Sequence, residues 1–388
     1  MSGPALLASL RTLFRDRYGR PPEVAAYAPG RVEVLGNHTD YNEGWVLSAA
    51  IDLGTYFVCR RRDDGACRLL AGDVLEEAAF DAAAPAPSQT HAWSNYVKGV
   101  LAGLAADAPA PHGFDAAFLG NVPLGAGLSS SAALEMSAGL ALAALYGRAV
   151  EPLRLARIGQ AAEHRFAGVK CGLLDQLTSL HGRDGMLVET DFRTFAVTHA
   201  PLGPEACLLL CNTHARHALV DGEYNRRRAA CEEAARHFAR ALPHPVRALR
   251  DVTPAEWESH RAGLPEETAR RAAHPIGENA RVREGARLLA QGDAAGFGRL
   301  MYASHESSRT LFENSCAELD AVVEASRRVP GVYGARLSGG GFGGSAVVLV
   351  HPRDAATAAA ALAAAYGHRF GRPCETRVLA PSGGARLL

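Results

Sequence analysis

The chain of 388 residues has no excess of charge of either sign, because 41 Lys and Arg residues balance 41 Asp and Glu residues. A neutral chain has no net field to attract a nucleic acid or an anionic membrane, so neither is an expected partner. The chain also lacks a long apolar run. The best candidate, residues 136–146, is about half of the roughly 20 residues that a bilayer requires. We therefore expect a soluble, cytoplasmic protein, and nothing in the composition implies an obligate protein partner.

The eight cysteines form neither a CxxC pair nor a cluster with the spacing of a metal site. Buried or reduced thiols are the simplest interpretation. The sequence shows no repeat of fixed period, which argues against a solenoid or a propeller. Because 388 residues exceed the usual size of one domain, the length favours two lobes, with a cleft available between them, or one large core with additions.

Strand-like and helix-like runs are mixed along the chain, which indicates an α+β fold. Alternating or short apolar runs predict strands at 25–35 and 114–119, and two more within 185–197. Helical spacing predicts helices at 130–146, 153–166, 223–241, 265–291 and 294–309. Residues 243–265 are rich in Pro and charge and have no apolar period, so they form either a connection between lobes or a long surface loop. We place a domain boundary near Leu202.

Residues 123–133, PLGAGLSSSAA, have the composition of a phosphate-binding loop. Gly125 and Gly127 allow a ligand to approach the backbone, and the serines that follow begin a run of good helix formers. The unpaired N–H groups and the positive dipole end of such a helix suit phosphate. The sequence GxxxxGK[ST] is not present, so this is not a Walker loop. The alternative is a simple turn and N-cap for a buried helix.

Two further segments have compositions that suit a binding site. Residues 338–345, SGGGFGGS, lie between strand-like runs at 332–337 and 346–350, where a flexible linker is unusual, so we expect close approach to a ligand or another backbone. Residues 28–46, APGRVEVLGNHTDYNEGWV, place many hydrogen-bonding side chains beside the end of a strand. Such a density of donors and acceptors suits a ligand with several hydroxyl groups. A solvated turn is the alternative for this segment.

These three segments, in this order, resemble the three motifs of the GHMP small-molecule kinases, and the detailed similarity is to the galactokinase family. GRVEVLGNHTDYNEG is similar to the family's sugar signature, AEHRFAGVKCGLLDQ to its catalytic segment and HALVDGEYNRRRAACEEA to its sugar-side helix. ARLSGGGFGGS and the terminal SGGAR also match. The resemblance implies ATP-dependent phosphorylation of the anomeric hydroxyl of galactose to galactose 1-phosphate, the first committed step of galactose catabolism.

The fold implied by this resemblance is the two-lobed α+β fold of the GHMP kinases. The N-terminal lobe, residues 1–202, would be related to the ribosomal protein S5 domain 2-like fold and would carry the sugar signature and the phosphate loop. The C-terminal lobe, residues 203–388, would be ferredoxin-like and would carry the third, glycine-rich motif.

The resemblance also assigns roles to the positions that match. Asp175 matches the base for the anomeric hydroxyl, and Arg31 matches the arginine that stabilises charge beside it. The expected sugar-binding residues are Asn37, His38, Thr39, Asp40, Gly172 and Tyr224. The expected ATP-binding residues are Gly125, Ala126, Gly127, Leu128, Ser129, Ser130 and Ser131. Ser131 and Glu163 match the ligands of Mg²⁺, a cation that prefers oxygen ligands and bridges phosphate oxygens.

Residues 30–44, the run GRVEVLGNHTDYNEG, are called the sugar segment below. This segment departs from the family pattern at two positions. Family members usually carry Glu at the position of Asn37 and Asn at the position of Glu33. Glu33 can simply relocate the carboxylate. Asn37, which is expected to face the C6 end of the sugar, removes a negative charge and adds donors, and this makes galacturonate a rival substrate. The run 307–312, SSRTLF, also departs from the pattern, and the sequence gives no functional account of it.

Two classes of alternative remain. A related kinase acting on N-acetylgalactosamine, arabinose, mevalonate or homoserine would keep the phosphate loop and change the sugar segment, although the HTDYN run favours a sugar. A non-catalytic sensor would bind sugar and ATP and signal to a partner protein. The intact serine run and the presence of Asp175 and Arg31 argue against the sensor.

Overall fold

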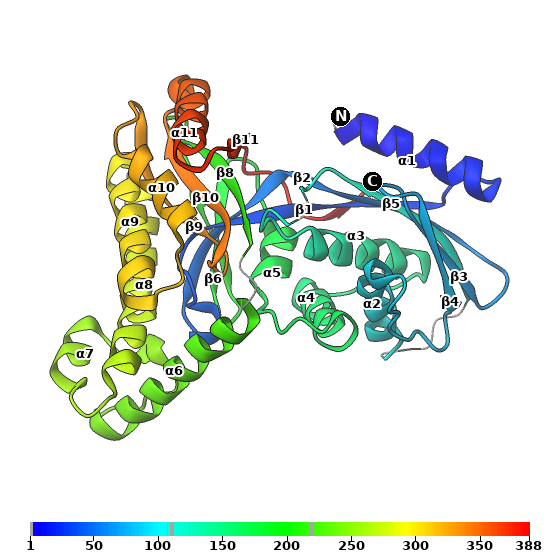
Figure 1. The fold of residues 1–388 in the computed structure, drawn as a ribbon. Helices are drawn as coiled ribbons and strands as arrows, with labels where there is room; N and C mark the ends of the chain where they lie inside the picture. The colour runs from blue at the N-terminus through cyan, green and yellow to red at the C-terminus, as the bar shows by residue number, and fades with distance from the viewer. Residues whose placement is uncertain (1–2, 107, 109–111, 124, 217–219) are drawn as a thin grey trace.

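Two β-sheets and the helices packed around them make up the structure, a computed structural model that describes residues 3–106, 108, 112–123, 125–216 and 220–388 (Figure 1). Two of the predicted motifs are therefore covered only in part. Leu124 of the phosphate loop and residues 217–219 of the sugar-side helix lie outside the described residues. Within the described ranges, no helix is both long enough and apolar enough to cross a bilayer.

The first sheet is built mostly from the N-terminal half of the chain. Its strands are β1 (Val24–Leu35), β2 (Trp45–Arg61), β3 (Ala66–Ala71), β4 (Glu76–Asp81), β5 (Phe114–Gly120), β6 (Met186–Asp191), β7 (Val197–Pro201) and β12 (Arg386–Leu387). They are hydrogen-bonded in the order β12-β1-β2-β5-β3-β4, and β6 pairs with both β2 and β7. The pairing of β3 with β5 is parallel, whereas β1, β2, β5 and β6 pair in antiparallel fashion.

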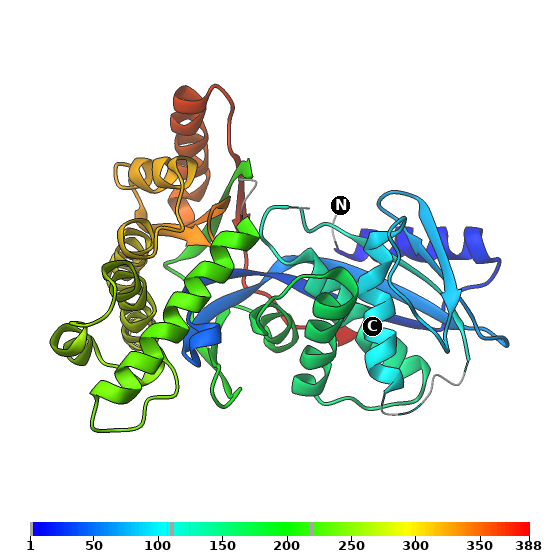
Figure 2. The same ribbon diagram turned by 60° about the horizontal axis from the view of Figure 1, so that its bottom comes forward.

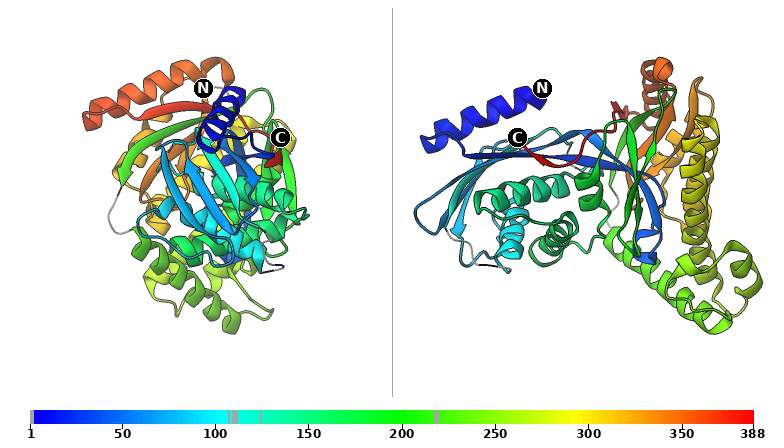
Figure 3. Two further views of the ribbon diagram at one scale, coloured as in Figure 1. Left: turned by 90° about the vertical axis from the view of Figure 1, so that its right-hand side faces the viewer. Right: turned by 180° about the vertical axis from the view of Figure 1, so that it is seen from behind.

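Strands β1 and β2 are buried over most of their length, because both faces of this sheet are covered. Helices α2 (Asn95–Ala105), α3 (Ser130–Leu145), α4 (Pro152–Ala162) and α5 (Leu174–His181) cover one face, and α1 (Gly3–Tyr18) lies on the other (Figures 1 and 3). Leu6, Leu10 and Phe14 recur every four residues and so form one apolar side of α1, which packs against Tyr27 and Tyr56 of the sheet.

The second sheet has four antiparallel strands in the order β11-β8-β10-β9. These strands are β8 (Cys207–Arg216), β9 (Val332–Ser338), β10 (Gly343–Val350) and β11 (Glu375–Leu379). The helices of this half are α6 (Val220–Ala241), α7 (Pro254–His260), α8 (Glu266–Ala290), α9 (Ala294–Ser307), α10 (Ala317–Ser326) and α11 (Ala355–Phe370). Figure 2 shows α6, α7 and α8, coloured green to yellow, projecting together away from the second sheet.

One apolar core connects the two sheets. Leu35 and Leu47 of the first sheet lie in the same cluster as Val347 and Leu349 of the second sheet and Phe297 of α9. The loop after β1 and the loop between β9 and β10 therefore meet at this junction. The boundary that we propose between residues 202 and 203 lies between β7 and β8, where the chain passes from one sheet to the other.

Most predicted elements are confirmed, with shifts of a few residues at their ends. The strand at 25–35 is β1, the strand at 114–119 is β5, and the region 185–197 contributes β6 and the start of β7. The helices predicted at 130–146 and 265–291 are α3 and α8. The prediction of an irregular segment at 243–265 is wrong in part, because Thr253 and Glu256 form a capping box that starts the short helix α7.

Candidate active site

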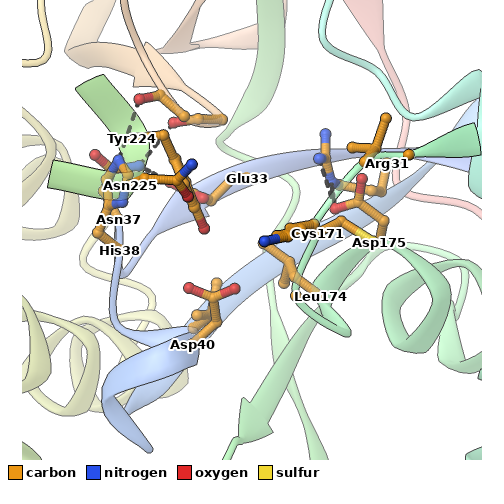
Figure 4. Close-up of a pocket in the computed structure, with 17 residues that line it drawn as sticks. Arg31, Glu33, Asn37, His38, Asp40, Cys171, Leu174, Asp175, Tyr224 and Asn225 are labelled. Atoms are coloured by element: carbon orange, nitrogen blue, oxygen red, sulfur yellow. Dashed lines mark hydrogen bonds and ion pairs between the residues drawn. The ribbon is translucent and has the colours of Figure 1, made fainter. Parts of the chain in front are cut away.

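A pocket of about 370 Å³ lies at the junction of the two sheets and has the volume of an ordinary small-molecule site. Strand β1 and the loop after it, the segment between α4 and α5, helix α6 and the glycine-rich loop after β9 contribute its walls (Figure 4). The predicted site residues that line it are Arg31, Asn37, His38, Asp40, Gly172, Asp175 and Tyr224. Segments that are far apart in the sequence are thus brought together.

Arg31 and Asp175 form the best-connected pair in this pocket. The Nε and Nη2 atoms of Arg31 lie 2.7 and 2.6 Å from Oδ1 of Asp175, and its Nη1 donates to the carbonyl oxygen of Gly127 at 2.6 Å. The hydroxyl of Ser129 donates to Oδ2 of the same carboxylate. These contacts orient the carboxylate of Asp175 and join it to the predicted phosphate loop.

The phosphate loop lies beside this pocket and does not line it. Gly125 and Gly127 adopt positive φ angles of 73° and 74°, as glycine does most readily, and both are exposed. Ala126 and Leu128 alternate with them and point into the shared core. Ser129, also with positive φ, precedes the first residue of α3. The loop is thus anchored through its apolar residues and leaves its glycine backbone accessible.

The glycine-rich segment 338–345 contacts both the phosphate loop and the sugar segment. The hydroxyl of Ser345 donates to the carbonyl oxygen of Ala126 at 2.7 Å, and Ser338 bonds to the backbone N–H and carbonyl groups of Glu33. The carbonyl oxygens of Gly339 and Gly340 accept from the sugar segment. The predicted close approach of this segment to another backbone is confirmed.

The amide of Asn37 is bonded within the protein. Its Nδ2 donates to Oε1 of Glu33 at 2.9 Å and to the carbonyl oxygen of Gly339 at 2.7 Å, and its Oδ1 accepts from Nδ2 of Asn314 at 2.9 Å. Both amide hydrogens are therefore used. Glu33 lines the pocket and keeps a carboxylate beside Asn37, so the loss of negative charge expected from Asn37 alone does not occur.

His38 also uses both ring nitrogens for protein contacts. Its Nε2 lies 3.1 Å from the carbonyl oxygen of Gly340 and its Nδ1 lies 2.9 Å from the hydroxyl of Tyr41. A carbonyl only accepts, so Nε2 carries the hydrogen and Nδ1 accepts from Tyr41. Burial lowers the pKa of His38 to about 4, which keeps the ring neutral. Phe312 packs between His38 and His274, which gives one residue of the unexplained run 307–312 a place in the site.

Thr39, one of the predicted sugar-binding residues, is not among the residues that line the pocket. Its side chain is fully buried and its hydroxyl lies 2.7 Å from the carbonyl oxygens of Gly36 and Trp45, so it fixes the turn beneath the site. Asp40 and Gly172 do line the pocket. A Cβ atom at Gly172 would lie 2.1 Å from Oδ2 of Asp40, so a larger residue here would displace the Asp40 carboxylate.

Tyr224, on α6, reaches the pocket from the opposite side. Its ring lies 5.2 Å from the ring of His38 and 5.7 Å from the ring of Tyr41, measured between centroids. Burial raises the pKa of its hydroxyl, which therefore stays protonated and can act as donor or acceptor. Figure 4 shows Tyr224 beside Asn37 and His38, away from the Arg31–Asp175 pair.

Ser131 and Glu163, the predicted metal ligands, lie close together at the start of α3. The hydroxyl of Ser131 donates to Oε1 of Glu163 at 3.0 Å. Burial, reinforced by the charge of Asp175, raises the pKa of Glu163 to about 7, and burial beside Glu163 raises the pKa of Glu135 as well. Glu163 begins a π-helical turn at the end of α4, a distortion that is frequent at functional sites.

Several residues at this site were not predicted. Glu33, Lys170, Cys171, Asn225, Gly339 and Gly340 also line the pocket. All of them lie within or next to the matched motifs, so the motifs could have pointed to them. Glu278 is different. It is fully buried on α8 and accepts from the backbone N–H groups of Gly36 and Asn37, and no local sequence pattern indicates a contact over about 240 residues.

Comparison with known proteins gives the site its context. Residues 12–61 match the model of the galactokinase galactose-binding signature, residues 95–183 match the GHMP kinases N terminal domain, and residues 286–368 match the GHMP kinases C terminal domain. The galactokinase of Chloroflexus aurantiacus is 39% identical over 378 residues, which is 97% of both chains. The human galactokinase is 42% identical over 370 residues, 93% of this chain and 92% of the human protein. The chain belongs to the galactokinase family.

Solved structures agree with this assignment. The crystal structure of Lactococcus lactis galactokinase complexed with galactose superimposes with a TM-score of 0.93 at 31% identity, covering 98% of this chain and 100% of the other. The mevalonate kinase of Methanococcus jannaschii, at 15% identity and a TM-score of 0.64, shares the fold. The predicted two-lobed GHMP kinase fold is confirmed. The galactokinase family consists of sugar kinases, so membership implies ATP as the phosphoryl donor.

Proposed function

We propose that this member of the galactokinase family transfers the γ-phosphoryl group of ATP to the anomeric hydroxyl of galactose. The observation that carries the proposal is the connection of Asp175, through Arg31 and Ser129, to the glycine loop beside the pocket. The galactose-binding signature over residues 12–61 supports the choice of sugar. The relative solved with galactose, at 31% identity over 98% of this chain, supports it as well.

The mechanism follows from the chemistry of these side chains. The anomeric hydroxyl would donate to Asp175, which accepts its proton as the oxygen attacks the γ-phosphorus and the bond to ADP breaks. Arg31 orients the carboxylate through Oδ1 and offsets negative charge that develops on the transferred group. Ser129 occupies one lone pair of Oδ2, so the sugar hydroxyl would use the second or replace this contact.

The residues near α3 fit a magnesium ion that accompanies ATP. Mg²⁺ prefers oxygen ligands, commonly one or two carboxylates together with phosphate oxygens and water. Ser131 and Glu163 offer a hydroxyl and a carboxylate 3.0 Å apart, and the raised pKa of Glu163 indicates a buried negative charge without enough compensation. We propose that these two residues hold the ion, which would supply charge neutralisation of the β- and γ-phosphates.

The loop between β5 and α3 is the proposed phosphate site. The exposed backbone of Gly125 and Gly127 and the N-terminus of α3 offer N–H donors and the positive end of a helix dipole. Ser130 and Ser131 begin this helix and add hydroxyl groups. ATP bound here would point its terminal phosphate toward Ser129 and so toward Asp175.

An assay of ADP release with a panel of sugars tests the proposal. Galactose, N-acetylgalactosamine, arabinose and galacturonate are each incubated with ATP and Mg²⁺, and galactose is expected to give the highest kcat/KM. The absence of turnover on galactose, with sugar and ATP binding intact, would favour the sensor instead.

A substitution of Glu163 tests the proposed magnesium ligand. Glu163→Gln is expected to raise the Mg²⁺ concentration that gives half the maximal rate. Glu151→Gln, at an exposed position of the same region of the chain, should not change this concentration.

A further inference from the structure

Glu33 lies between the two ends of the sugar pocket. It stands two residues after Arg31 on β1, so both side chains point to the same side of the strand, and both line the pocket. The register of β1 with β2 is irregular on either side of this pair, between Pro29 and Arg31 and between Glu33 and Leu35. Such irregularities turn side chains away from a regular sheet. Figure 4 shows Glu33 between Arg31 and the group formed by Asn37 and His38.

One oxygen of the Glu33 carboxylate, Oε1, accepts hydrogen bonds from within the protein. Nη1 of Arg336 and Nδ2 of Asn37 each donate to Oε1 at 2.9 Å. Arg336 is completely buried, and its Nε and Nη2 atoms have no hydrogen-bond partner among the described residues. A buried guanidinium needs a charged partner, because leaving it uncompensated is strongly destabilising. Glu33 is therefore the partner of a buried guanidinium, and its orientation is fixed.

The other oxygen is left for a ligand. In the part of the chain that the structure describes, Oε2 of Glu33 has no hydrogen-bond partner, although the side chain is only 6% exposed. A carboxylate oxygen accepts hydrogen bonds and cannot donate them. It therefore matches a hydroxyl of a bound sugar and repels a carboxylate at the same place. Asn37 cannot donate a hydrogen bond to a sugar carboxylate at this place, because both of its amide hydrogens are already used.

We propose that Glu33, held by Arg336 and Asn37, is the residue that selects a hydroxyl over a carboxylate at C6 of the sugar. The inference rests on the proposed function, which places the anomeric oxygen at Asp175. It also uses the expectation that position 37, which contacts Glu33, faces the C6 end of the sugar. Galactose and galacturonate differ only at C6. The geometry thus favours galactose and rejects the sugar acid.

The unmodified protein provides the first test. Initial rates are measured with galactose, 6-deoxygalactose and galacturonate at fixed ATP and Mg²⁺. A hydrogen bond to a charged group predicts a kcat/KM about tenfold or more lower for 6-deoxygalactose than for galactose, and a still lower value for galacturonate. Equal kcat/KM values for galactose and galacturonate would overturn the inference. If none of the three sugars is phosphorylated, the proposed function fails, and the inference with it.

Two variants separate the charge of Glu33 from its reach. Glu33→Gln keeps the shape and removes the charge, so the ratio of kcat/KM for galactose to that for galacturonate should fall at least about tenfold. Glu33→Asp keeps the charge but shortens the side chain. The kcat/KM for galactose should therefore fall, while the kcat/KM for galacturonate stays low. Loss of the same factor on galactose and on 6-deoxygalactose in Glu33→Gln, with the ratio unchanged, would show a purely structural role.

An exchange variant protects the test against a folding defect. Glu33→Gln leaves Arg336 without its partner and can lower stability, which thermal unfolding would reveal. The double substitution Glu33→Asn, Asn37→Glu returns a carboxylate to the neighbouring side chain, 2.9 Å away across the present hydrogen bond. It is expected to recover galactose activity and selectivity relative to Glu33→Asn alone. No recovery in a stably folded double variant would contradict a carboxylate at this end as the selecting group.

Discussion

Arg31 donates to Oδ1 of Asp175 through Nε at 2.7 Å, and the same guanidinium donates through Nη1 to the carbonyl oxygen of Gly127. A single side chain thus ties the proposed base to the proposed phosphate loop. Because Arg31 also lies on β1 within the sugar segment, its contacts connect the pocket to the proposed phosphate loop. The chemistry that we propose depends on this alignment.

Replacing Asp175 by Asn should remove most of the catalytic rate. The amide cannot take the proton from the anomeric hydroxyl, and general-base catalysis typically contributes a factor of about 10² to 10⁴. We expect kcat to fall by that range while the KM for ATP changes little, as measured by steady-state ADP release. Asp16→Asn, an exposed position on α1, serves as the control for loss of one carboxylate. Turnover close to that of the unmodified protein would remove Asp175 from the mechanism.

Replacing Glu278 by Gln should weaken sugar binding from a distance. Oε2 of Glu278 accepts the N–H groups of Gly36 and Asn37 at 3.0 Å each, so it holds the turn that carries the sugar segment. We expect the KM for galactose to rise more than kcat falls, with the KM for ATP nearly constant. Glu284→Gln, an exposed residue of the same helix, is the matched control. Equal effects on both substrates would indicate a general loss of stability rather than positioning.

Gly172→Ala should disturb Asp40 directly. The added Cβ would lie 2.1 Å from Oδ2 of Asp40, a distance that forces the carboxylate to move. We expect a higher KM for galactose in steady-state kinetics and little change in the KM for ATP. Gly222→Ala on α6 is the control, because a Cβ there meets no described atom within 4 Å. If Gly172→Ala and Gly222→Ala behave alike, Asp40 does not contribute to sugar binding.

Acid should destabilise the fold through two buried histidines. Burial lowers the pKa of His38 to about 4 and of His274 to about 3, below an ordinary value of 6.5, so both resist protonation in the folded state. Their contribution to stability is complete above pH 6.5 and is lost as the pH falls below it. At pH 5 each should cost about 2 kcal/mol.

Thermal unfolding between pH 7 and pH 5 checks this expectation. His274→Phe removes one of the two titrations, so its Tm should fall less steeply over this range than that of the unmodified protein. His368→Phe, at an exposed position of α11, should leave the slope unchanged. An identical slope in His274→Phe would show that His274 does not resist protonation in the folded protein.

The parts of the site that could be predicted from the sequence are those encoded locally. Glycines and serines at 125–131 and the polar run after β1 carry their chemistry in neighbouring residues, and the structure places both beside Asp175. Strand β2 was not predicted, because most of its 17 residues are buried and show no alternation of apolar and polar side chains. Helix α7 was overlooked although the Thr253-Pro254-Ala255-Glu256 run is a typical helix start.

The state of individual side chains could not be predicted, because it depends on partners far along the chain. The amide of Asn37 forms hydrogen bonds with Gly339 and Asn314, which lie about 300 residues away in the sequence. No periodicity in the sequence predicts such contacts. The relocation of the carboxylate from position 37 to Glu33 could be expected from the sequence, but the contacts of Glu33 with Arg336 and Asn37 that hold it could not.

The identity of the product tests the central claim most directly. The purified protein is incubated with galactose, ATP and Mg²⁺, and the product is examined by ³¹P and ¹H nuclear magnetic resonance. We predict a single sugar phosphate whose phosphorus couples to the anomeric hydrogen, formed by the unmodified protein and nearly absent with Asp175→Asn. A phosphate on any other hydroxyl of galactose, or equal formation of the 1-phosphate by Asp175→Asn, would contradict the account.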